Sequence, residues 1–217
     1  MSDEAVRTKQ LILIPAVVTL AITLLRLAGE LLGGPALLFN REAGGGGALV
    51  GIAWLVPVFG AWFGWKLARA GSAPRLLRAL GLTLVALALV PLTGLLIERA
   101  GIPQQSLTTL WIFVAVSIVG IVVAVSAWPA LGRTLLAYGL AARIPVALVM
   151  LVAMLANWGT HYDVAPSPDF PAMGTLAKWV TIGLAPQLTI WIWYTVVLGA
   201  LFGIAAAAVA RRRPAAA

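Results

Sequence analysis

The 217-residue chain contains no cysteine. It can therefore form no disulfide, present no thiolate nucleophile and hold no zinc or iron–sulfur cluster through cysteine. Its single histidine leaves no histidine pair for axial haem ligation. The sequence also lacks the His-Glu-x-x-His zinc helix, the Gly-x-x-x-x-Gly-Lys phosphate loop and the Gly-x-Ser-x-Gly nucleophile turn. These absences argue against the familiar intramembrane hydrolases and haem redox proteins, and they leave the cofactor and any enzymatic activity open.

Charged residues are also scarce, at 10% of the chain against roughly 25% in an ordinary soluble domain. Apolar residues make up 62%, and the mean hydropathy is +1.02. Such a composition cannot cover a water-facing surface, whereas a helix that crosses a bilayer needs about 20 mostly apolar residues. We therefore expect an all-α, polytopic transmembrane helical bundle that forms a single domain over residues 1–217.

Six apolar stretches, separated by turns rich in glycine and proline, are long enough to span a membrane. The predicted spanning helices cover residues 11–32, 48–67, 76–97, 107–131, 135–158 and 178–209. Residues 211–217 are predicted to form a disordered cytoplasmic tail.

The basic residues predict how this bundle is oriented. With both termini in the cytoplasm, 11 of the 15 Lys and Arg residues fall on cytoplasmic segments, as the positive-inside bias requires. This bias explains the net charge of +8 better than a nucleic-acid partner does, because the basic residues lie between apolar runs and form no basic face. Short loops and an Ala-, Gly- and Arg-rich, Lys-poor composition point to the cytoplasmic (plasma) membrane of a bacterium, with the lipid bilayer as the surrounding medium.

The start of the fifth helix is open, because Arg143 lies near the middle of its apolar stretch. In one interpretation, residues 133–142 form an interfacial helix and the spanning helix begins at Arg143, where Pro145 suits a first turn. In the other, the helix begins earlier and Arg143 lies inside the bundle, where a charge is costly and usually has a partner. The sequence favours the first interpretation.

Small residues at four-residue spacing let membrane helices approach one another closely. The sequence contains three such glycine pairs, Gly47/Gly51, Gly60/Gly64 and Gly199/Gly203. Packing within the bundle is the main expectation for these pairs, and contact between copies in a homo-oligomer is the alternative.

Polar residues gather toward the extracytoplasmic ends of four predicted helices. Arg26 and Glu30 share one face of the first helix and can pair. Arg26 lies about 22 Å along that helix, which places it in the outer third of a ~30 Å hydrocarbon layer. An ionisable group at that depth indicates a functional site, although a structural ion pair is the alternative. The candidate ligand-binding residues are Arg26, Glu30, Glu98, Asn157, His161, Tyr162, Asp163 and Gln187.

Three functions are compatible with this cluster. The favoured one is binding or transport of a small molecule or lipid in the outer half of the bundle, with Arg26 holding an anionic headgroup or carboxylate. One alternative is a membrane-embedded hydrolase or transferase that uses Glu30, Glu98, His161 or Asp163 on an extracytoplasmic substrate. The other is a scaffold or accessory subunit of a membrane complex. The pattern His161-x-Asp163 is too short to indicate a metal site, and none is predicted.

Overall fold

The structure is a computed structural model that describes residues 3–167 and 170–212. It is 75% helical, and the described residues form no strand. The α-helices are α1 (Asp3–Leu31), α2 (Leu55–Arg69), α3 (Leu76–Arg99), α4 (Leu107–Ala127), α5 (Pro129–Ala156), α6 (Thr175–Lys178), α7 (Ala185–Leu188) and α8 (Ile190–Arg212). A 3-10 helix, η1 (Ala43–Gly45), follows α1, and a π-helix, η2 (Trp179–Leu184), joins α6 to α7.

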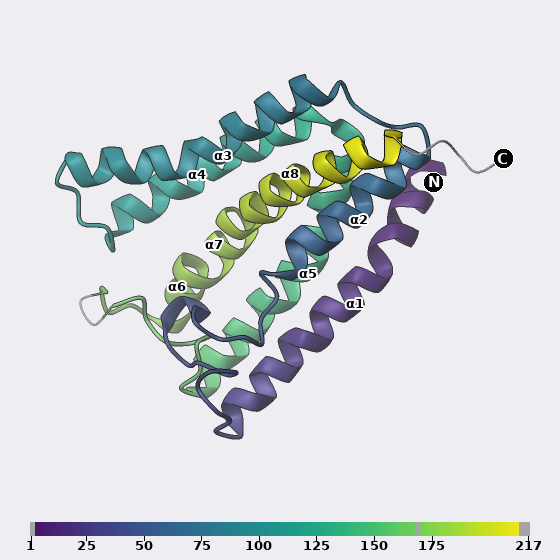
Figure 1. The fold of residues 1–217 in the computed structure, drawn as a ribbon. Helices are drawn as coiled ribbons and strands as arrows, with labels where there is room; N and C mark the ends of the chain where they lie inside the picture. The colour runs from purple at the N-terminus through teal and green to yellow at the C-terminus, as the bar shows by residue number, and fades with distance from the viewer. Residues whose placement is uncertain (1–2, 168–169, 213–217) are drawn as a thin grey trace.

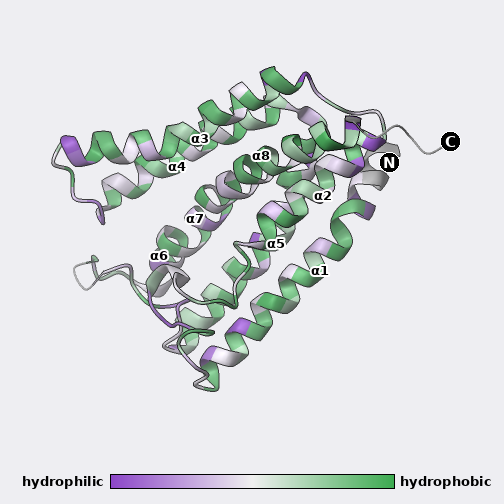
Figure 2. Ribbon diagram, in the orientation of Figure 1, coloured by the Kyte–Doolittle hydropathy of each residue, from purple (hydrophilic) through white to green (hydrophobic). Residues whose placement is uncertain are grey.

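Five helical segments are long and apolar enough to cross a membrane, namely Thr8–Leu31, Leu76–Arg99, Leu107–Ala127, Pro129–Ala156 and Thr175–Arg211. Figure 2 shows hydrophobic residues along most of their length, with hydrophilic residues concentrated at helix ends and in loops. Many large apolar side chains on these helices are exposed, including Ile14, Leu77 and Leu155. A soluble monomer rarely exposes apolar surface of that extent, so the chain has the character of a membrane protein.

The second predicted helix, at residues 48–67, is shorter in the structure and is not among these five. α2 begins at Leu55 rather than at Ala48 and has 15 residues, which corresponds to about 22 Å at 1.5 Å per residue. Residues 49–54 form bends and a turn instead. Hydropathy alone cannot distinguish a helix from irregular backbone in this stretch, because irregular backbone at membrane depth is tolerated where it is buried in protein or lines a cavity. Six spanning helices therefore stay a prediction.

The boundary between the fourth and fifth helices also differs from the prediction. α4 ends at Ala127, and Trp128 has an extended conformation (φ −148°, ψ 89°) before Pro129 begins α5. Residues 129–131, predicted in the fourth helix, therefore belong to the fifth. The cause is Pro129, which disfavours a helical conformation in the residue before it and suits the first turn of the next helix.

α5 is one uninterrupted helix that contains Arg143 and Pro145 in its interior. A separate interfacial helix at 133–142 is therefore wrong, and the second interpretation of Arg143 is the one that holds. The Arg143 side chain is inside the bundle, with a residue exposure of 4%.

Figure 1 shows α1, α2, α5 and α8 side by side, with the start of α1 and the end of α8 at the same end of the bundle. α3 and α4 pack on each other and on α8, and at their far end this hairpin diverges from α6 and α7 (Figure 1). Both ends of the described chain thus lie on one side, as expected, while the orientation in a membrane stays a prediction. Of the predicted tail 211–217, residues 213–217 lie outside the described residues.

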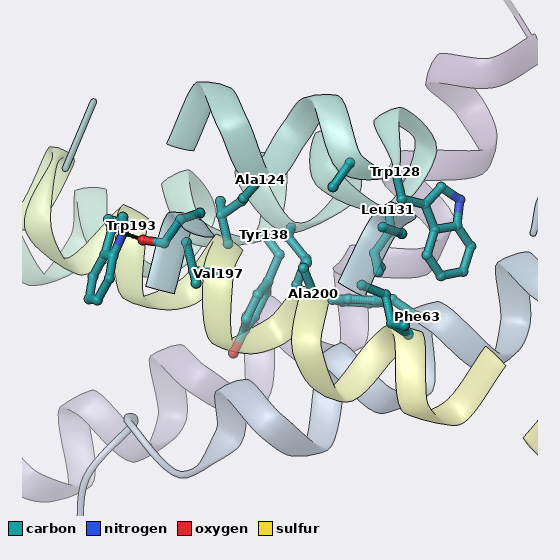
Figure 3. Packing of buried hydrophobic residues seen from close by; sticks show 14 of the residues in the cluster. Phe63, Ala124, Trp128, Leu131, Tyr138, Trp193, Val197 and Ala200 are labelled. Atoms are coloured by element: carbon teal, nitrogen blue, oxygen red, sulfur yellow. Dashed lines mark hydrogen bonds between the residues drawn. The ribbon is translucent and has the colours of Figure 1, made fainter. Parts of the chain in front are cut away.

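The half of the bundle nearest the termini is closed by an apolar core. Tyr138 packs edge-on against Phe63 with ring centres 5.6 Å apart, and its hydroxyl lies 2.8 Å from that of Thr19 on α1. Trp193 donates its indole N–H to the Ala86 carbonyl at 3.0 Å, which links α8 to α3. Figure 3 shows these rings interleaved with Leu131, Val197 and Ala200.

α2 and α8 approach closely because glycines face each other. A Cβ atom added to Gly60 would lie 2.5 Å from the Cα of Gly199, and one added to Gly64 would overlap Gly203. These two pairs pack within the chain, which is the main expectation stated for them. A homo-oligomer stays a prediction, with these two glycine surfaces already buried in the fold.

We predict that Gly64→Ala lowers the free energy of unfolding by about 1–3 kcal/mol, because the added methyl group must push α2 and α8 apart. Gly81→Ala on α3 is the matched control, since a Cβ atom there meets nothing within 4 Å. Thermal unfolding in detergent is the measurement, and equal midpoints for the two variants would contradict the close packing.

Candidate functional site

A cavity of about 690 Å³ lies in the half of the bundle away from the termini. Its walls come from α1, segment 43–54, the start of α4, α5, the loop after α5, and the η2–α8 region. Apolar and aromatic side chains form much of the lining, among them Ile52, Phe113, Met150, Ile182 and Trp191. Pockets for small molecules are commonly about 300–1,000 Å³ and mostly apolar, with a few polar groups.

Glu30 forms the polar framework beside this cavity. Its residue exposure is 0%, and its Oε1 accepts a hydrogen bond from Nε of Arg26 at 2.9 Å. Its Oε2 accepts one from the backbone N–H of His161 at 2.9 Å. Arg26 also donates from Nη2 to the Asn40 carbonyl at 3.0 Å, and Arg41 donates to the Glu30 carbonyl. The predicted Arg26–Glu30 pair is present and joins α1 to the loops around residues 40 and 161.

His161 packs its imidazole against the same carboxylate, with Nδ1 2.5 Å from Oε1 of Glu30. Burial lowers the pKa of His161 below its ordinary value of 6.5, and the nearby positive charge of Arg26 acts in the same direction, although the hydrogen bond to Glu30 opposes both. The ring is therefore neutral at pH 7, with its proton assigned to Nδ1, where it donates to Glu30.

Asp163 holds the shape of the loop that carries His161. Its carboxylate accepts hydrogen bonds from the backbone N–H of Gly159 at 2.9 Å and of Thr160 at 2.7 Å. Lys178 donates to the Asp163 carbonyl at 2.6 Å. These bonds fix the loop, and Asp163 does not line the cavity.

The remaining predicted site residues divide into two groups. Tyr162 and Gln187 line the cavity together with Arg26 and His161. The Tyr162 hydroxyl donates to the Thr23 carbonyl at 3.3 Å, and burial raises its pKa, so it stays a neutral phenol. Asn157 caps α5 in a left-handed conformation and is exposed, and Glu98 is exposed at the end of α3. Neither Asn157 nor Glu98 lines the cavity.

Arg143 is the main cavity residue absent from the predicted site. Its Nη1 lies 3.5 Å from Oε1 of Gln187, and its guanidinium carbon lies 4.5 Å from the ring centre of Trp191. Its Nε is buried without a hydrogen-bond partner. The sequence did indicate Arg143, because an arginine within an apolar stretch is unusual. The favoured interpretation nevertheless placed Arg143 at the membrane surface, because it took Pro145 as part of the first turn of a helix.

The run of four glycines, Gly44 to Gly47, forms part of the cavity wall. The predicted pair Gly47/Gly51 lies outside any helix, so it is not a helix-packing pair. Gly45 has φ +67°, and a Cβ atom on it would lie 2.6 Å from Cδ2 of His161. A Cβ atom on Gly51, further along the same segment, would lie 3.3 Å from Nη1 of Arg26. Glycine allows both the left-handed conformation and the close approach of the backbone to the two side chains.

The helix predicted at 178–209 begins earlier and is irregular where it meets the cavity. It includes the π-helix η2, then Pro186, and a non-helical conformation at Thr189 (φ −126°, ψ −71°) between α7 and α8. Gln187 and Trp191 on either side of this break both line the cavity. Such interruptions of the helical hydrogen-bond ladder often occur at functional sites.

The groups suggested for catalysis do not all lie together. Glu30 contacts His161, and Asp163 lies in the same loop as His161, whereas Glu98 is exposed at the end of α3. Within residues 3–167 and 170–212, no group of three His, Asp or Glu side chains could hold a metal ion.

No protein-family model matches the chain, and neither a curated protein nor a solved structure matches it. The fold and the site by themselves define its class, which is an all-helical protein with five helices apolar enough to cross a membrane and a cavity bordered by buried arginines.

We predict that the free energy of unfolding falls as the pH drops below about 6.5. The folded protein holds His161 neutral with a lowered pKa, so below pH 6.5 the unfolded chain takes up the proton first. Each further drop of one pH unit then lowers the free energy of unfolding by up to about 1.4 kcal/mol. Above pH 6.5 the contribution is complete. His161 is the single histidine, so His161→Gln is the control, and a pH profile of unfolding equal in the two proteins would refute the assignment.

Proposed function

We propose that the chain is a ligand-binding membrane protein whose cavity takes a small molecule or lipid in the extracytoplasmic half of the bundle. The observation that carries this proposal is the cavity itself, because apolar walls and two buried arginines, Arg26 and Arg143, border one space of about 690 Å³. An amphiphilic ligand fits such a lining, with its polar group near the arginines and its apolar part against Phe113 and Met150.

The lining of the cavity supports binding over a purely structural role for the polar residues. Apolar and aromatic side chains and two arginines border a space of the size that small molecules commonly occupy.

Ligand entry is supported from the outer side of the bundle. On the side of the cavity that faces the termini, Tyr138 on α5 and Val196 on α8 belong to the buried core, with exposures of 1% and 0%. This buried core closes the end of the cavity that faces the termini, so we expect a ligand to enter from the extracytoplasmic side.

Transport is the second candidate function, and the break between α7 and α8 favours it. Discontinuous helices beside a substrate site are a recurring feature of membrane transporters. Transport by this chain would require the core under the cavity to open, with Thr189 as a natural hinge between α7 and α8.

We predict that a molecule bound in the cavity stays with the protein when it is extracted with its native lipids in copolymer nanodiscs, and that mass spectrometry detects it. Ala48→Trp should reduce its amount by about tenfold or more, because the indole fills the space beside segment 43–54. Ala48 lines the cavity and is half-buried.

Leu155→Trp is the matched control, because it adds the same bulk to an outward position of α5 that is 65% exposed. It should retain the bound molecule at the wild-type amount. Equal retention in the Ala48→Trp and Leu155→Trp proteins, or no molecule bound to the wild type beyond bulk lipid, would reject the proposed function.

A further inference from the structure

Arg143 carries a positive charge inside the bundle, and its charge is not balanced by an acidic group. An arginine side chain stays protonated in proteins and has five N–H donors. Among the described residues, the hydrogen bond to Gln187 at 3.5 Å is the contact these donors make with a polar side chain, and the buried Nε makes none. Neither an amide nor the face of Trp191 carries a full negative charge.

Arg26 shows how the same fold treats an arginine that is part of the framework. Its Nε pairs with Glu30 at 2.9 Å, and Glu30 is itself fully buried. The described cavity lining contains Arg26 and Arg143 but no Asp or Glu. Because the charge of Arg26 is balanced by Glu30, the cavity has an uncompensated positive charge at Arg143.

A buried charge without a counter-ion is costly, and in a membrane helix it marks a functional site whose partner must be found. The carboxylates of the described chain do not supply that partner. A ligand in the cavity can, since the cavity is the space that the Arg143 side chain borders.

We propose that the ligand of this cavity is an anion whose phosphate or carboxylate group pairs with the guanidinium of Arg143, an inference that rests on the proposed function. A planar guanidinium binds the oxygens of either group through two parallel hydrogen bonds. Arg143 lines the cavity, so its guanidinium borders the space in which such a group would lie. The apolar part of the ligand then lies against the wall that includes Ile182 and Phe113.

The anionic group can belong to a lipid headgroup or to a soluble molecule, and three probes separate these sources. Dihexanoyl phosphatidic acid carries a phosphate on short acyl chains, and dihexanoyl phosphatidylcholine has the same chains without net charge. Inorganic phosphate has no apolar part. The measurement is the shift in the thermal unfolding midpoint of the full-length protein in neutral detergent, because a bound ligand stabilises the folded state.

We predict that phosphatidic acid raises the unfolding midpoint of the wild type and that phosphatidylcholine at the same concentration does not. Arg143→Met should abolish the rise and weaken binding by about tenfold or more. Arg99→Met, at an exposed position at the end of α3, should retain it. A rise with phosphatidic acid but not with inorganic phosphate assigns the anion to a lipid, and equal rises assign it to a soluble molecule.

The midpoints without any probe separate a binding role of Arg143 from a structural one. Arg143→Met removes an unbalanced buried charge, so its midpoint should equal or exceed that of the wild type. Arg26→Met leaves Glu30 without its ion-pair partner, so its midpoint should fall. A fall for Arg143→Met comparable to that for Arg26→Met would overturn the proposal, because it would show that Arg143 supports the fold.

Two further results would overturn the anion while leaving the proposed function in place. One is an equal rise with phosphatidylcholine and phosphatidic acid, and the other is a rise that persists in Arg143→Met but disappears in Ala48→Trp. In contrast, an absence of any probe effect, together with no bound molecule in nanodiscs, would reject both the anion and the ligand-binding function.

Discussion

The Glu30 carboxylate holds together three segments that are far apart in the sequence. It pairs with Arg26 one turn earlier on α1 and accepts hydrogen bonds from His161, which is 131 residues away. Arg26 in turn binds the carbonyl of Asn40, so the loops before α2 and after α5 are both tied to α1. A fully buried carboxylate needs all of these donors, because an unpaired charge at this depth would be very costly. The part of the cavity wall that these two loops form depends on this one group.

The two ends of the bundle solve the packing problem in different ways. Near the termini, glycines allow α2 and α8 to touch, and large rings such as Phe63 and Tyr138 fill the core without exposed surface. At the other end α2 has not yet begun, and the backbone of segment 43–54 takes its place. Irregular backbone is stable there because it faces a cavity and the side chains of Arg26 and His161. The short length of α2 therefore leaves room for segment 43–54, which lines the cavity.

Local signals predicted much of the fold and part of the site. Apolar runs located the membrane-length part of α1 (Thr8–Leu31), α3 and the C-terminal helical segment to within a few residues, since about 20 apolar residues admit few other structures. The helix α1 itself begins earlier, at Asp3. The Arg26–Glu30 pair was predictable because residues four apart share a helix face. The partnership of Glu30 with His161 was not, because it depends on tertiary contacts. The start of α2 was not predictable either, since residues 48–54 are as apolar as the helix that follows them. The depth of Arg143 was not predictable, because Pro129 and Pro145 both suit the first turn of a helix.

The two arginines of the cavity differ in what they require. Arg26 is balanced by Glu30 and lies against backbone, so its geometry is set before any ligand arrives. Arg143 lies deeper, between Gln187 and the ring of Trp191, and a neutral amide and an aromatic face orient a guanidinium without cancelling its charge. In the apolar interior a remaining positive charge acts strongly on an approaching anion, because little water screens it. In the proposed site, one arginine is balanced and one is not, so the site would select an anion by charge and its apolar walls would select by shape.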